Sequence, residues 1–201
     1  MVNEENLRLG IQIFNNRNWT EDLHNCFYLE TEERFNEYLN TNNHTIFWDY
    51  IVNNLSKWKA LRGKKHFTKQ ILFDKLREQN NLLRTNINGT IHLNNSFENC
   101  EWNNLQDLFE FAKTLKDVRS PVFASKFCHF LFPNLFIVKD NALVGTRNNY
   151  ENYWSNCKNG WLNCPTKELL IQILSEEIVN PIPNYPYATK IAELCYIGSR
   201  N

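Results

Sequence analysis

The sequence predicts an all-α fold, built as a single globular domain over residues 1–201. Apolar residues recur every three or four positions through most of the chain, which is the spacing of one face of an α-helix. Several of these segments also begin with a serine or threonine cap or a first-turn proline. Hydrophobic residues make up 42% of the chain and aromatic residues 14%, which is enough to fill one core without staples.

Helices are predicted over most of the N-terminal half. The clearest begins at the N-cap Thr45 and continues to a stop at Gly63. Residues 86–95, with the sequence NINGTIHLNN, turn at Asn88-Gly89 and predict at most one short β-hairpin. The helices predicted here cover residues 4–14, 31–39, 45–63 and 68–83.

Helices are predicted over most of the C-terminal half. Ser120-Pro121 is its strongest start signal, because serine caps a helix and proline suits the first helical position. Pro133 should end that helix, and a very tight link should join it to the helix before it. The predicted ranges are residues 105–115, 121–132, 149–158, 165–179 and 186–197.

Charge and cysteine content narrow the class of protein. Lys and Arg number 22, as do Asp and Glu, so only the local distribution of charge can indicate a nucleic-acid partner. The six cysteines form no CxxC pair and have no zinc-ligand spacing to histidine, so we expect reduced thiols, no metal and no cofactor. No leader and no apolar run of about 20 residues is present, so we expect a cytoplasmic protein with no membrane partner.

Lys126 and Asp140 stand out because they lie in and at the end of the most hydrophobic segment, residues 119–145. On a helix that begins at Pro121, Lys126 shares a face with apolar residues, which would lower its pKa and make the amine a nucleophile. The alternative is a snorkelling lysine whose head reaches water. Asp140 is either a carboxylate beside Lys126 or the N-cap of a short helix at residues 142–145.

Two stretches are candidates for contact with a phosphate backbone. The first is the run KWKALRGKKHFTK, which has no acidic residue between Asp49 and Asp74, although a solvated helix end is the competing interpretation. The second is the link before Pro121, where a helix N-terminus exposes free N–H groups. The candidate residues are Lys57, Lys59, Arg62, Lys64, Lys65 and Lys69 in the run, and Lys116, Arg119 and Ser120 in the link.

The order helix, tight link, helix with an early lysine, apolar run and aspartate resembles the helix-hairpin-helix DNA glycosylase superfamily. The stretch ASKFCHFLFPNLFIVKDN looks like a bacterial branch with the oxoguanine-glycosylase fold, and the resemblance covers residues 105–160. It implies that Lys126 attacks the sugar of a flipped nucleotide and that Asp140 assists departure of the base.

The leading hypothesis is therefore a protein of the glycosylase-like fold that binds duplex DNA, and whether it also removes a damaged base as a DNA N-glycosylase is left open. A second hypothesis is a non-enzymatic module that binds DNA or another partner and keeps the scaffold without the chemistry. A third is a plain structural helical protein, which predicts no salt-dependent DNA binding.

Overall fold

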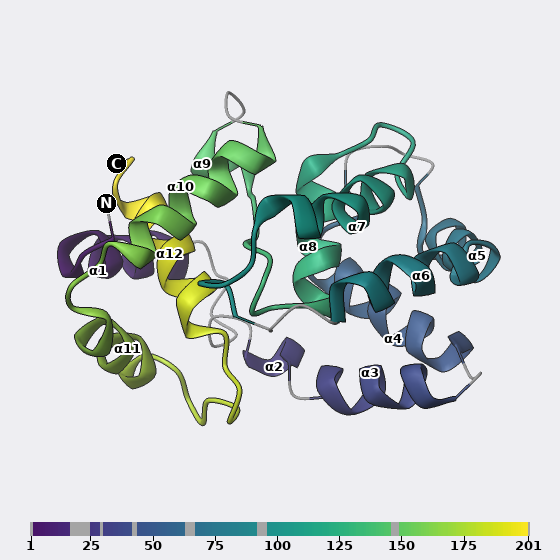
Figure 1. Ribbon diagram of the computed structural model, residues 1–201, viewed down its shortest axis with the longest axis horizontal. Coiled ribbons are helices and arrows are strands. Elements are labelled where there is room, and N and C mark those ends of the chain that lie inside the picture. The colour runs from purple at the N-terminus through teal and green to yellow at the C-terminus, as the bar shows by residue number, and fades with distance from the viewer. Residues whose placement is uncertain are drawn as a thin grey trace.

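The computed structural model describes residues 2–16, 25–28, 30–41, 44–62, 67–91, 96–145 and 149–200. Within these ranges all regular structure is helical, so the all-α prediction is confirmed (Figure 1). The helices are α1 Glu4–Asn15, α2 Asn25–Tyr28, α3 Thr31–Asn40, α4 His44–Lys57, α5 Lys69–Glu78, α6 Asn80–Ile91, α7 Trp102–Thr114, α8 Pro121–Leu131, α9 Asn141–Val144, α10 Tyr150–Leu162, α11 Lys167–Glu176 and α12 Tyr187–Gly198.

The predicted β-hairpin is wrong where it can be compared, because α6 continues through Asn88-Gly89 to Ile91. Leu83 and Ile87 lie four residues apart and are both fully buried, which fixes a helical face against the core. That burial outweighs the turn preference of the Asn-Gly pair. The rest of the predicted hairpin, residues 92–95, lies outside the described residues.

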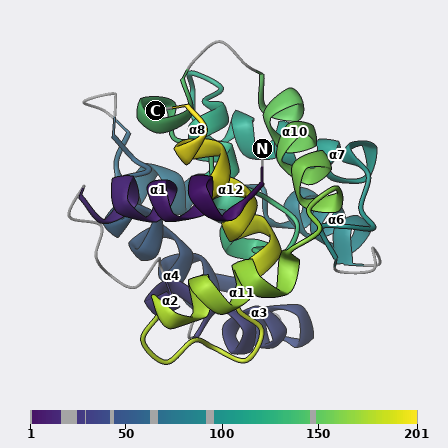
Figure 2. The same cartoon turned by 90° about the vertical axis from the view of Figure 1, so that its left-hand side faces the viewer.

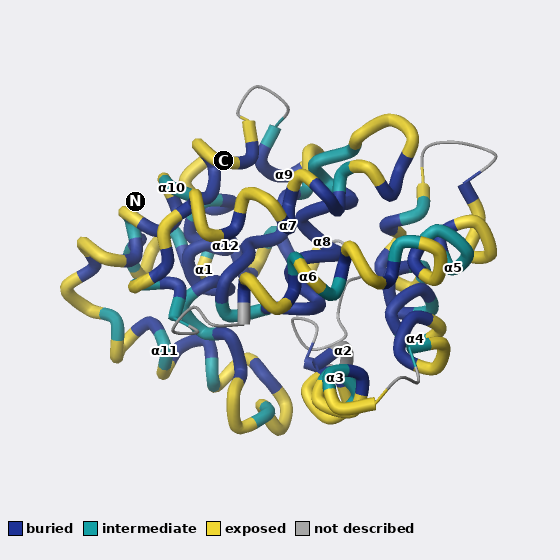
Figure 3. The backbone as a smooth tube through the Cα atoms, turned by 45° about the vertical axis from the view of Figure 1, so that its right-hand side comes forward, coloured by how far each residue is buried: buried dark blue, intermediate teal, exposed yellow. Residues whose placement is uncertain are grey.

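Helix α8 lies at the centre of the molecule, and every residue from Phe123 to Leu131 in it is buried (Figure 3). It packs against α7, α3 and α4. The predicted start is confirmed, since the Ser120 hydroxyl accepts a hydrogen bond from the N–H of Phe123 and Pro121 takes the first helical position. The segments that flank α8 are therefore fixed relative to the core.

The two ends of the chain are packed together, because α1 crosses α12 with the two backbones in close contact (Figure 2). A Cβ atom on Gly10 would overlap the carbonyl oxygen of Leu194, and one on Gly198 would overlap that of Asn6. Only glycine permits this approach, so the crossing joins the N-terminal helix to the C-terminal helix.

We predict that Gly10→Ala destabilises the fold by at least about 1–3 kcal/mol, because the added methyl group must push the two helices apart. Gly89→Ala is the matched control, since its Cβ would meet nothing within 4 Å and alanine is the better helix former. Urea unfolding followed by circular dichroism measures both variants. Equal stability of the two would contradict the role given to the crossing.

Candidate functional site

Helix α4 ends earlier than predicted, at Lys57, and residues 58–62 form a turn. The N–H of Ala60 donates to the carbonyl of Leu55 and the N–H of Lys59 to that of Ser56, which is the pattern of a Schellman motif. Lys59 occupies the left-handed position of this motif, with φ 58°, where glycine is the usual residue. The predicted stop, Gly63, lies outside the described residues.

Lys116 ties this turn to the link between α7 and α8. Its side chain is buried, and its Nζ donates to the carbonyl oxygens of Ala60, at 3.3 Å, and Arg62, at 2.6 Å. Burial lowers the pKa of the ammonium. The predicted phosphate contact of Lys116 is untested, but the structure shows this ammonium directed at the turn.

The link itself contains a second basic residue with a left-handed backbone conformation. Arg119 has φ 45°, its side chain is exposed, and its N–H donates to the carbonyl of Lys116 at 2.8 Å. Ser120 follows as the N-cap of α8. Lys116 thus joins the turn, which carries Lys59 and Arg62, to the link, which carries Arg119. We call the exposed side chains of these three residues the basic face.

The remaining members of the predicted basic run are placed differently. Lys57 and Lys69 are exposed, and each lines a shallow hollow that also contains Asp49. The Nζ of Lys69 also donates to the side-chain oxygen of Asn53 at 2.9 Å. The run lacks a nearby acid in sequence, but the fold supplies one in space. Lys64 and Lys65 lie outside the described residues.

Lys126 is held inside the protein, with 4% of its surface exposed, so its head does not reach water as a snorkelling lysine would. Its Nζ donates to the carbonyl oxygen of Trp58 at 3.0 Å and lies 5.8 Å from the centre of that indole ring. Desolvation lowers the pKa of the ammonium, Asp140 and Glu193 oppose this, and Arg62 and Lys116 add to it.

Asp140 is the N-cap of α9, because its carboxylate accepts a hydrogen bond from the N–H of Ala142 at 2.8 Å. Its charge also favours the protonated form of Lys126, so the two side chains lie within electrostatic reach of each other. The capping interpretation is therefore shown, and the charge of the carboxylate also acts on the amine of Lys126. Its role in chemistry stays a prediction.

Further buried charges were not singled out by sequence reasoning. Lys139, Lys158 and Lys190 are buried, and so is Glu193, which accepts a hydrogen bond from Lys190 Nζ at 3.0 Å. The three-residue spacing of Lys190 and Glu193 on an otherwise apolar helix was the available signal. Lysine burial is thus a repeated feature of this core, and by itself it does not mark Lys126.

His129 lies at the centre of α8 and is fully buried. Its Nδ1 lies 2.6 Å from the carbonyl oxygen of Phe136, which can only accept, so Nδ1 carries the proton. Nε2 therefore accepts from the hydroxyl of Tyr28. The pKa of His129 is lowered to about 3, mainly by desolvation. The hydrogen bond to Phe136 raises this pKa, and the charge of Lys190 lowers it further.

We predict that the neutral His129 makes the fold sensitive to acid. The unfolded chain binds the proton near pH 6.5 and the folded chain only near pH 3, so stability is lost as the pH falls through this window. The loss of folding free energy is up to roughly 5 kcal/mol, because each unit of pKa difference between the folded and unfolded chain contributes about 1.36 kcal/mol. Urea unfolding at several pH values should show the native protein and His129→Gln differing most at pH 7 and converging towards pH 3. A constant difference would contradict the assignment.

No protein-family model, no curated protein and no solved structure matches this chain. Among the described residues, no helix has both the length and the apolar character that a bilayer span requires. The same residues contain no group of three or more histidine, cysteine, aspartate or glutamate side chains arranged to hold a metal ion.

Proposed function

We propose that this protein binds the phosphate backbone of duplex DNA through the basic face. The observation that carries the proposal is the backbone of Lys59 and Arg119, which are both left-handed although neither is glycine. A left-handed conformation costs a residue with a Cβ about 1–2 kcal/mol. Strain of this kind is concentrated at functional sites. Of the three described non-glycine residues with positive φ, Lys59 and Arg119 present an exposed cation, and the third, Asn180, is of a type that adopts this conformation readily.

The surroundings of the basic face favour an anion. The N-terminus of α8 adjoins Arg119, and the aligned peptide dipoles place partial positive charge there. Asp117, the acidic residue of the link, is paired with Lys75 at 2.6 Å. The resemblance to helix-hairpin-helix glycosylases supports the same partner, since their hairpin grips the DNA backbone.

We predict that Lys59→Gly combined with Arg119→Gly weakens DNA binding while leaving the fold as stable as before, or more stable by up to about 1 kcal/mol. The slope of log K against log salt should fall by about 2, since each lost phosphate contact removes about 0.9. Fluorescence anisotropy with a labelled duplex gives the affinity, and urea unfolding gives the stability.

Arg8→Gln is the matched control for this pair. Arg8 is an exposed cation on α1 that pairs with Glu4 at 2.9 Å, so its loss should change neither the affinity nor the slope. If Arg8→Gln reduces salt-dependent binding as much as the Lys59→Gly and Arg119→Gly pair does, binding is not localised to the basic face. Absence of DNA binding by the folded protein would leave the partner-binding or purely structural alternative.

A second candidate function is base excision at the same site. Its specific support is the lowered pKa of Lys126 together with the charge of Asp140 nearby, which is the pair that the glycosylase resemblance requires. The amine is buried and must give up its hydrogen bond to Trp58 before it reaches a nucleotide, and we infer that the 58–62 turn moves to release it. Without that movement, the protein is a binding module that has kept the scaffold.

We predict that excision, if retained, depends on both side chains. Duplexes that carry uracil, 8-oxoguanine, an alkylated purine or an abasic site would be tested for strand breaks with and without hot alkali. Asp140→Asn should abolish alkali-revealed breaks, and Lys126→Met should abolish the borohydride-trapped covalent adduct.

Lys139→Met is the control for the lysine variant, because it removes another buried lysine in the neighbouring segment. Intact strands across all substrates, from protein that still binds DNA, would rule out excision and retain the binding function. Breaks that survive Asp140→Asn would contradict its assigned role.

A further inference from the structure

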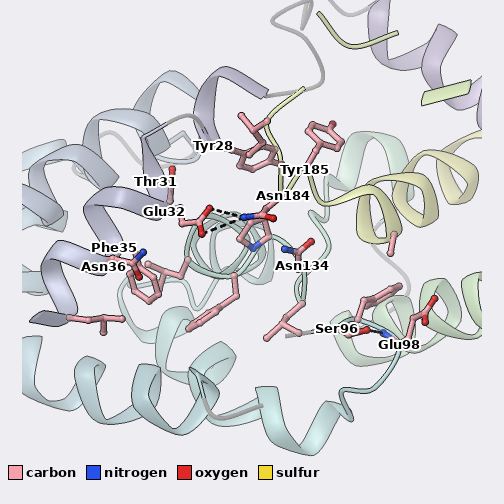
Figure 4. Close-up of a pocket in the computed structure, with 18 residues that line it drawn as sticks. Tyr28, Thr31, Glu32, Phe35, Asn36, Ser96, Glu98, Asn134, Asn184 and Tyr185 are labelled. Atoms are coloured by element: carbon pink, nitrogen blue, oxygen red, sulfur yellow. Dashed lines mark hydrogen bonds between the residues drawn. The ribbon is translucent and has the colours of Figure 1, made fainter. Parts of the chain in front are cut away.

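A cavity of about 630 Å³ lies between α3, the end of α8 and the segment before α12 (Figure 4). Neither Lys126 nor Asp140 lines it, so it is separate from the site described above. Its volume is in the range that proteins use for small molecules.

The inner wall of the cavity is largely aromatic and aliphatic. Phe35 and Phe132 meet edge to face with ring centres 5.5 Å apart, and Tyr28 and Tyr185 do so at 5.9 Å. The hydroxyl of Tyr28 is engaged by the buried His129, so this residue offers the cavity its ring. Such a wall binds an apolar or aromatic body, and its ring faces attract cations.

The charged residues among the described lining are both acidic. Glu98 is already neutralised, because its Oε1 accepts from Lys167 at 2.9 Å and Trp161 at 2.7 Å and the pKa of its carboxyl is lowered, most strongly by the hydrogen bond from Lys167. Glu32 is exposed, and its carboxylate accepts from the side-chain amide of Asn184 at 3.2 and 3.4 Å. These distances lie at the long end of the hydrogen-bond range.

The contact between Glu32 and Asn184 joins α3 to the segment before α12, and Figure 4 shows the two side chains pointing toward each other within the cavity lining. A neutral amide at long distance is a weak partner for a carboxylate, and a charged donor is a stronger one. A ligand ammonium can therefore replace Asn184 at Glu32 while the rest of the molecule contacts the aromatic wall.

We propose that this cavity binds a small organic monocation, an amine or guanidine that carries an aromatic or aliphatic body. An anion meets the carboxylate of Glu32, and the cation beside Glu98, Lys167, is already engaged in its ion pair, so the described lining favours a cation over an anion. A neutral molecule gains the apolar contacts but not the charge-assisted hydrogen bond to Glu32. This proposal is independent of DNA binding, since the basic face contributes no residue to the cavity lining.

Three indole compounds with the same ring test the proposal: tryptamine, tryptophol and indole-3-propionate. Ligand-observed NMR titration with the full chain should give the tightest binding for tryptamine and the weakest for indole-3-propionate. Glu32→Gln should weaken tryptamine binding by about fivefold, the size expected for an exposed charge pair, and leave tryptophol unchanged. Glu33→Gln, an exposed neighbour on α3 that does not line the cavity, is the matched control.

A second variant shows where the compound binds. Ala188 lines the cavity, so Ala188→Phe should fill it and abolish tryptamine binding, with circular dichroism confirming that the protein is folded. The proposal is overturned if tryptamine does not bind, if the three compounds bind equally, or if neither Glu32→Gln nor Ala188→Phe changes tryptamine binding. DNA affinity should be the same in Glu32→Gln as in the native protein, which separates this site from the proposed function.

Discussion

Two buried ammonium groups fix the geometry on which the candidate site depends. An ammonium removed from water is costly unless its protons find acceptors, and here Lys126 and Lys116 find them in the 58–62 turn. The turn is therefore held by α8 from within and by the α7–α8 link from the side. Its left-handed Lys59 is tolerated because these contacts over-determine the backbone around it.

Helix α8 connects the two sites that the structure suggests. At one end it begins beside the basic face, and at the other its last residues line the cavity. Between them, His129 holds the hydroxyl of Tyr28 in the cavity wall and packs its ring 5.8 Å from that of Trp58. A movement of the 58–62 turn would therefore disturb Trp58 and, through His129, the aromatic wall of the cavity.

Local signals in the sequence predicted most of the helices, and they predicted the start of α8 because Ser120-Pro121 acts within one turn. The single helix predicted over residues 68–83 is wrong, since α5 ends at Glu78 and α6 begins at Asn80. Local signals also failed where distant packing decides, as at Asn88-Gly89, and where a lysine takes the position usual for glycine, as at Lys59. Two contacts of charged residues could not be predicted because the partners come together only in the folded chain. Asp49 approaches the basic run only in space, and Glu32 meets Asn184 across 152 positions.

The other buried lysines are the comparison against which the role of Lys126 is judged. Each costs desolvation energy, and Lys116 and Lys158 offset that cost with backbone carbonyls as Lys126 does. Burial also lowers the pKa of Lys116, so burial with a lowered pKa is compatible with a purely structural role. Lys126 shares its acceptor turn with Lys116, and what distinguishes Lys126 is that the charge of Asp140 acts on its amine. The strained cations fit the DNA-binding proposal with that turn closed, whereas excision requires it to open. Movement of the turn is therefore the property that separates a DNA-binding module from an enzyme.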